Sequence, residues 1–185
     1  MNTGLVLIDI QKDYFPGGRM EVAGSTGSSE KARILLGSFR SAELPIFHIQ
    51  HISTRKGAIF FLPKTDGIEF NPNVKPTGDE VVITKHYPNS FRDTNLENHL
   101  SKMGVETIVF CGMMSHMCVD ATVRAAFDKG YDCMVAHDAC AAKSIIFGEV
   151  EAPSDHVHAA FMGALGAVYA KVLSAEEIAD ETTSK

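Results

Sequence analysis

Short apolar runs that alternate with segments of helical periodicity constrain the fold of this chain most strongly. The run from Gly4 to Ile10 is almost wholly apolar, as expected of a strand that is buried on both faces. Further strands are predicted at 44–49, 80–84, 106–110 and 131–136, with a short sixth one near 167–169. Helices are predicted at 28–41, 95–103, 118–129 and 154–165, with another from Ser174. This alternation indicates parallel β-α-β units. We therefore predict an α/β fold: one domain over residues 1–185, with three α/β/α layers around a mostly parallel, Rossmann-like sheet of six strands.

Composition limits the classes of partner. The chain has 185 residues, of which 22% are charged, and a formal net charge of −6 with no basic cluster. This argues against nucleic acid or an anionic membrane as the main partner and leaves a small-molecule substrate. Acidic residues come too early at the N-terminus for a signal peptide, and the four cysteines include no CxxC pair. We expect a reduced, cytoplasmic setting without a zinc ribbon.

Three reactive side chains follow three different predicted strands. Asp9 lies near the end of the first strand, Lys85 directly follows the third, and Cys118 opens the helix after the fourth. Ligands of open parallel sheets bind at the carboxyl ends of the strands. The pattern therefore predicts that Asp9, Lys85 and Cys118 meet at one edge of the sheet.

Cys118 is the candidate nucleophile. Ser115 is predicted to cap the helix, which would place Cys118 in the first helical turn, where the helix dipole favours an anion. A lowered pKa and a reactive thiolate would follow. The alternative is that Cys118 is simply a small buried residue, as we expect for Cys111 and Cys133.

Three segments carry a resemblance that covers nearly the whole chain. They read LIDIQKDYF at 7–15, ITKHYPNSF at 83–91 and CGMMSHMCV at 111–119. In this order the chain resembles the isochorismatase-like cysteine hydrolases, which include nicotinamidases. The resemblance implies a catalytic triad in which Cys118 attacks a carbonyl carbon, Asp9 moves the proton, and Lys85 supports both by its charge.

The same resemblance implies further parts of the site. Members of the family carry a cis peptide bond before the nucleophile, which would join Met113 and Met114 here. The backbone N–H groups of Met114 and Cys118 would then stabilise the oxyanion. Candidate substrate contacts, each of which could instead serve core packing or capping, are Phe15, His51, Tyr87, Phe91 and His116.

Metal ligands are where the chain departs from the nicotinamidases. Those enzymes carry an Asp-x-His motif after the second strand and further histidines on the next loop. Here His51 is preceded two residues earlier by Ile49, and residues 55–73 contain no histidine. We predict no catalytic metal and no cofactor, and we expect His51 to contact the substrate instead.

The resulting hypothesis is a cysteine hydrolase that cleaves a C–N bond of a small amide through a thioester on Cys118. Isochorismatases proper cleave a vinyl ether and lack that cysteine. Three alternatives remain: a hydrolase of a non-amide bond, a non-enzymatic binding protein, and a thiol redox protein that pairs Cys118 with Cys111 or Cys140. The resemblance also implies a homo-oligomer, dimer or tetramer, with the loop at 51–79 as a lid or an interface.

Overall fold

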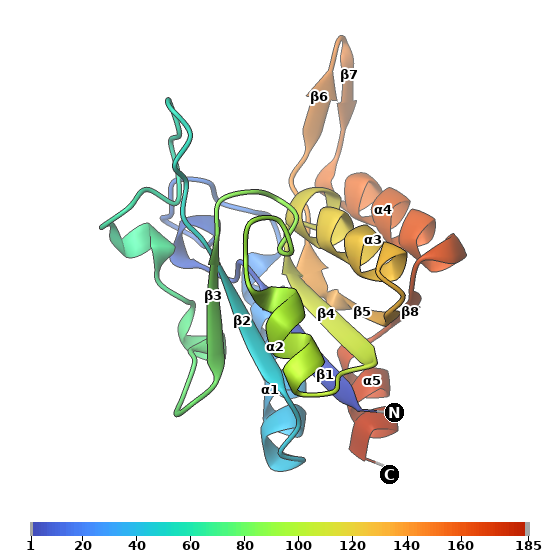
Figure 1. Cartoon of the computed structure of the whole chain (residues 1–185). Coiled ribbons are helices and arrows are strands. Elements are labelled where there is room, and N and C mark those ends of the chain that lie inside the picture. The colour runs from blue at the N-terminus through green and yellow to red at the C-terminus, as the bar shows by residue number, and fades with distance from the viewer. Residues whose placement is uncertain (1, 184–185) are drawn as a thin grey trace.

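A six-stranded parallel sheet runs through the molecule in the order β3-β2-β1-β4-β5-β8 (Figure 1). The computed structural model describes residues 2–183. The strands of this sheet are β1 (Thr3–Ile8), β2 (Ile46–His51), β3 (Val81–Lys85), β4 (Thr107–Met113), β5 (Asp132–Ala141) and β8 (Lys171–Leu173). The predicted parallel, six-stranded α/β architecture is confirmed.

Helices cover both faces of the sheet. They are α1 (Ser25–Ser41), α2 (Leu96–Lys102), α3 (Asp120–Asp128), α4 (Ser154–Val168) and α5 (Ala175–Thr183). Helices α1 and α5 share one buried apolar cluster with the sheet, whereas α2, α3 and α4 share the other. The two clusters give the three-layer arrangement that the sequence predicted.

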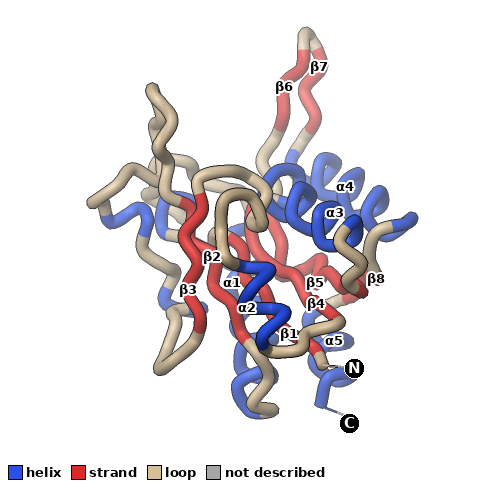
Figure 2. The backbone as a smooth tube through the Cα atoms, viewed as in Figure 1, coloured by secondary structure: helices blue, strands red, loops and turns tan. Residues whose placement is uncertain are grey.

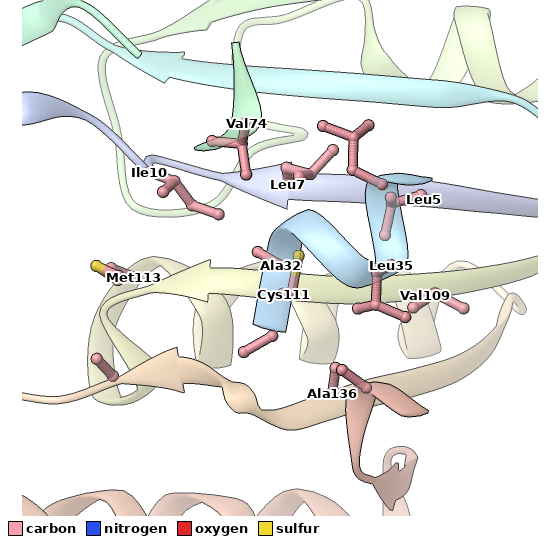
Figure 3. Packing of buried hydrophobic residues seen from close by; sticks show 14 of the residues in the cluster. Leu5, Leu7, Ile10, Ala32, Leu35, Val74, Val109, Cys111, Met113 and Ala136 are labelled. Atoms are coloured by element: carbon pink, nitrogen blue, oxygen red, sulfur yellow. The ribbon is translucent and has the colours of Figure 1, made fainter. Parts of the chain in front are cut away.

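Successive residues of the central strands point into opposite clusters. Leu5 and Leu7 of β1 face α1, whereas Val6 and Ile8 face the other helical layer. Figure 3 shows Ala32 and Leu35 of α1 packed over this surface. Burial on both faces explains why the first strand reads as a continuous apolar run rather than an alternating one.

Several element boundaries differ from the prediction. Helix α1 begins at Ser25, three residues early, and β5 continues to Ala141, five residues beyond its predicted end. The last strand occupies 171–173 rather than 167–169, because α4 continues through Val168. Gly166 directly follows the predicted end and would allow the helix to stop there, but Ala164, Leu165 and Ala167 are good helix formers and the helix continues through this glycine.

A projecting β-hairpin was not predicted. It consists of β6 (Ile145–Phe147) and β7 (Val150–Ala152), which pair antiparallel and extend away from the body of the molecule (Figure 1). Its apolar side chains are largely exposed, with Phe147 at 87%. Because each strand has only three residues, the sequence pattern is too short to show them.

The sheet order places β1 beside β4, at the point where the winding of the chain reverses. From β1 the chain winds outward through β2 and β3, then returns to β4 on the other side of β1. Such a reversal leaves a crevice at the carboxyl ends of the strands, where Figure 2 shows long loops in tan. Gly112 lets β4 approach β1 closely there, since a Cβ on it would lie 2.0 Å from the carbonyl oxygen of Ile8.

The loop at 52–80 is ordered by two short 3₁₀ turns, Asp66–Ile68 and Pro72–Val74, and a third, Lys12–Tyr14, follows β1. Among the described residues, no helix combines the length and the hydropathy that a membrane span requires.

Candidate active site

The carboxyl ends of four neighbouring strands bring the candidate residues together. Asp9 directly follows β1, His51 ends β2, and Lys85 ends β3. His51 and Lys85 are paired in the parallel register of β2 and β3, so their side chains are neighbours. Cys118 lies in a single π-helical turn, Ser115–Val119, that follows β4 and leads into α3.

The ammonium group of Lys85 is the centre of this cluster. Its Nζ lies 2.7 Å from Oδ2 of Asp9, 3.2 Å from Sγ of Cys118 and 2.9 Å from Nδ1 of His51. Lys85 and Asp9 are both fully buried. Burial opposes the charge of Lys85, but Asp9 and Cys118 outweigh it, and the pKa of the lysine is raised. Asp9 and Lys85 therefore form a buried ion pair that also contacts the sulfur.

The thiol of Cys118 is not ionised in advance, contrary to the prediction from its place at the start of a helix. Burial and the neighbouring Asp9 raise its pKa to about 12, although Lys85 acts in the opposite direction. The sequence could not show this, because the side chain is only 5% exposed and the effect comes from residues on other strands. Deprotonation of Cys118 therefore requires a base at the site.

Asp9 is a carboxylate close to the Cys118 thiol. A carboxylate oxygen of Asp9 lies within 4.8 Å of Cys118 Sγ, and its Oδ1 is buried without a hydrogen-bond partner among the described residues. The backbone of Asp9 is left-handed, with φ of 51°, which is uncommon for a residue other than glycine. Its free acceptor atom faces no competing donor, so it can take the thiol proton.

Ser115 does not cap the helix, which corrects the prediction. Met114 precedes the π turn and makes no side-chain cap. The Ser115 hydroxyl instead forms a hydrogen bond of 2.9 Å with Nδ1 of His158 on α4. That partner lies 43 residues further along the chain, which is why the local pattern misled. The expected cis peptide bond between Met113 and Met114 is present.

A divalent metal fits this cluster poorly. Asp9, His51 and Cys118 each offer a ligand atom within 4.8 Å of the others. However, Lys85 Nζ contacts all three of these residues, besides the carbonyl oxygen of Tyr87, so an ammonium group already serves as their shared cation. Because an ammonium can only donate hydrogen bonds, Nδ1 of His51 accepts one and is not free for a metal.

His51 is neutral over the physiological range. Burial is the largest cause, and together with Lys85 and His86 it lowers the pKa to about 4, against the influence of Asp9. With Nδ1 accepting from Lys85, the ring proton lies on Nε2. His51 thus offers an uncharged N–H donor at Nε2, whereas Asp9 and Lys85 are both charged.

A cavity of about 480 Å³ opens above Cys118. Of the five predicted substrate contacts, His51 and Tyr87 line it. Its lining residues are Tyr14, His51, Ser53, Thr54, Arg55, Ala58, Phe60, His86, Tyr87, Pro88, Met114, Met117 and Cys118.

The other three predicted contacts lie outside that lining. Phe15 is buried in the core beside α1, and Phe91 stacks on Tyr131. His116 turns toward Phe161 of α4. Tyr14 takes the place expected of Phe15, because a short 3₁₀ turn after β1 changes which neighbouring side chain faces the site.

Two buried polar residues that the sequence analysis missed hold the loops around the cavity. Gln11 exchanges hydrogen bonds with the backbone of His51 and donates to the Ile68 carbonyl. Asp13 accepts a hydrogen bond of 2.6 Å from the N–H of Phe61. Both belong to the segment 7–15. Polar residues within that otherwise apolar segment were the feature from which their role could have been predicted.

The four cysteines are all free and buried. Cys111 and Cys133 lie in the apolar clusters, as expected. No disulfide joins Cys118 to Cys111 or Cys140, as the redox alternative would require.

Known proteins are similar to this chain in sequence and in fold. The family model described as the isochorismatase domain matches residues 3–177. The uncharacterized isochorismatase family protein YddQ of Bacillus subtilis is 48% identical over 176 residues, which span 95% of this chain and 98% of that protein. A streptothricin hydrolase of Streptomyces noursei is 33% identical over 141 residues, 76% of this chain and 50% of that protein.

A solved structure gives the same result. An isochorismatase-type hydrolase from Oleispira antarctica superposes with a TM-score of 0.93 at 44% identity, and 96% of each chain is covered. With the domain match over nearly the full length, these similarities show that the chain belongs to the isochorismatase family of hydrolases.

Proposed function

We propose that this protein is a cysteine hydrolase that cleaves the C–N bond of a small amide through a thioester on Cys118. The observation that carries the proposal is the position of Lys85 Nζ, 2.7 Å from Asp9 and 3.2 Å from Cys118, beneath a cavity of small-molecule size. A cation in contact with both a base and a nucleophile supplies the parts that acyl transfer needs.

The first half of the reaction forms the thioester. Asp9 takes the proton of the Cys118 thiol as the sulfur attacks the carbonyl carbon and the S–C bond forms. The carbonyl oxygen becomes an oxyanion, which we assign to the backbone N–H groups of Met114 and Cys118. The intermediate collapses, the C–N bond breaks, and Asp9 returns the proton to the leaving nitrogen, so that ammonia or an amine departs.

The second half releases the acid. Asp9 takes a proton from a water molecule, and the oxygen of that water attacks the thioester carbon. The S–C bond breaks, and the proton returns to Cys118, so the net reaction consumes one water per amide. Throughout, Lys85 stabilises the carboxylate of Asp9 and the sulfur while it carries negative charge.

Ammonia release from a panel of small primary amides tests this proposal. We expect turnover by the wild type and none by Cys118→Ala, with near-identical circular dichroism for the two proteins. Ammonia release that survives in Cys118→Ala would refute the thioester route, whereas no ammonia release by the wild type would favour the alternative of a non-amide hydrolase. Homo-oligomeric assembly and a cytoplasmic location stay predictions beside this proposal.

A further inference from the structure

We infer that the substrate is a small amide that carries a carboxylate at the end remote from its scissile bond, and that Arg55 binds this carboxylate. The inference rests on the proposed function, which it extends from a reaction type to a class of substrate. It is drawn from the charge and hydrogen-bonding capacity of the cavity above Cys118.

Arg55 is the only residue with a permanent charge among those that line the cavity. The buried Asp9–Lys85 pair beneath it is neutral as a pair. Arg55 is exposed and forms no ion pair with any carboxylate between residues 2 and 183. The protein as a whole carries a net charge of −6, so the positive charge of Arg55 at the cavity is opposite in sign to the net charge of the protein.

Most of the remaining polar groups can donate a hydrogen bond, although the hydroxyl groups among them can also accept one. His51 presents its Nε2–H, since Nδ1 accepts from Lys85. The phenol of Tyr14 stays protonated, because burial and the nearby Cys118 and Asp9 raise its pKa well above the usual value. His86 is the exception, since its Nδ1 faces the Ile52 carbonyl oxygen and leaves Nε2 as an acceptor. Such a lining matches a ligand rich in acceptor oxygens.

The cavity walls limit the size and the polarity of the part of the ligand between its amide and its carboxylate. Phe60, Tyr87, Pro88 and Met117 give the cavity mainly apolar sides. A volume of about 480 Å³ lies within the range of sites for small molecules. A short hydrocarbon or aromatic spacer between amide and carboxylate satisfies both the apolar walls and the donors, whereas a cationic amide would be repelled by Arg55.

Matched substrates test the assignment. We would compare mono-amides of dicarboxylic acids, with four to eight carbons and one aromatic member, against neutral amides of equal length. The variants are Arg55→Met and, as a control that removes the same charge outside the cavity, Arg33→Met on α1. Arg33 is exposed and does not line the cavity.

The wild type should prefer the acid amides by at least about tenfold in kcat/KM, as expected for a charge-assisted contact. Arg55→Met should reduce this preference by about tenfold or more, mainly through KM, and Arg33→Met should leave it within about twofold. The KM of the acid amides should also rise with ionic strength in the wild type. An unchanged preference in Arg55→Met, or no preference in the wild type, would overturn the inference.

A binding measurement separates this inference from the proposed function. Calorimetry with Cys118→Ala, in the presence and absence of Arg55→Met, reports affinity without turnover. If the acid amides bind at least about tenfold more weakly without Arg55 but the wild type hydrolyses no amide at all, the assignment of Arg55 to a ligand carboxylate holds and the amidase proposal fails. Binding that does not depend on Arg55 refutes the substrate class whether or not amides are cleaved.

Discussion

Lys85 is the residue on which the chemistry of the site depends, because its single charge contacts a carboxylate, a sulfur and an imidazole at once. Residue types and their places after strands were enough to predict that Asp9, Lys85 and Cys118 would meet. The ionisation state of Cys118 could not be predicted in this way, since burial on all sides dominates its pKa. Local position sets the helix dipole, but tertiary packing sets the solvation.

Replacing Asp9 with Asn should separate the reactivity of Cys118 from its catalytic use. Asp9 raises the pKa of the Cys118 thiol and Lys85 lowers it, so removing the carboxylate should lower that pKa from about 12. We expect Asp9→Asn to react faster with iodoacetamide at pH 7 than the wild type does, while its amide turnover is lost. The alkylated residue is identified by mass spectrometry of tryptic peptides.

The matched control for this experiment is Lys85→Met, which removes the group that lowers the thiol pKa. Alkylation of Cys118 should then be slower than in the wild type. If both substitutions change the alkylation rate in the same direction, the opposed electrostatic roles of Asp9 and Lys85 are wrong.

At the scale of elements, long apolar strands and amphipathic helices were predictable, whereas loops and very short strands were not. The apolar face of α1 was identified from its spacing, because burial against the sheet needs that period. Tyr14 rather than Phe15 lines the cavity because hydrogen bonds from distant segments, such as the Phe61 N–H to Asp13, determine the path of the loop. Such contacts leave no periodic pattern.

Glu80 connects helix α1 to the strands β2 and β3. It accepts from Arg40 on α1 at 2.6 Å and lies 2.9 Å from Nε2 of the fully buried His48 on β2. Burial acts against ionisation, but Arg40, the N–H of Thr77 and His48 outweigh it and lower the pKa of Glu80 to about 2. The carboxylate therefore stabilises the folded state while it is ionised.

Glu80→Gln should lower the free energy of unfolding by about 1–2 kcal/mol at pH 7. This is less than the energy that corresponds to the whole pKa shift of Glu80, because the group is partly exposed and solvent screens its charge. Since the folded pKa lies below the unfolded one, the difference between the proteins should be constant above about pH 4.5. It should shrink as the pH falls through about 2. Urea unfolding between pH 2 and 8 measures both the plateau above about pH 4.5 and the loss below it.

The control is Glu30→Gln on α1, which removes an exposed carboxylate and should change the free energy of unfolding by less than about 0.5 kcal/mol. A pH-independent difference for Glu80→Gln, or one equal to that of the control, would show that the ionised carboxylate of Glu80 does not stabilise the fold.

For the whole molecule, the order of strands and helices along the chain was sufficient to predict the layers, because parallel units wind in only a few ways. The exposed hairpin at 145–152 could not be predicted in this way, since strands of three residues are too short to show a period. The family resemblance added the triad and the cis peptide bond, neither of which periodicity could supply.

Assembly is a prediction at this scale. We expect sedimentation velocity to give a mass that is two or four times the 20.1 kDa of one chain. A single species at 20.1 kDa across micromolar concentrations would contradict the expected homo-oligomer.

The central claim is a covalent bond between the substrate's acyl group and the sulfur of Cys118. The most direct measurement is the intact mass of enzyme that is quenched with acid within milliseconds of mixing with a hydrolysed amide. We predict an added mass equal to the acyl group, located on the peptide that contains Cys118 and absent from Cys118→Ala. Steady turnover of the amide with no acyl mass on that peptide at any quench time would contradict the account.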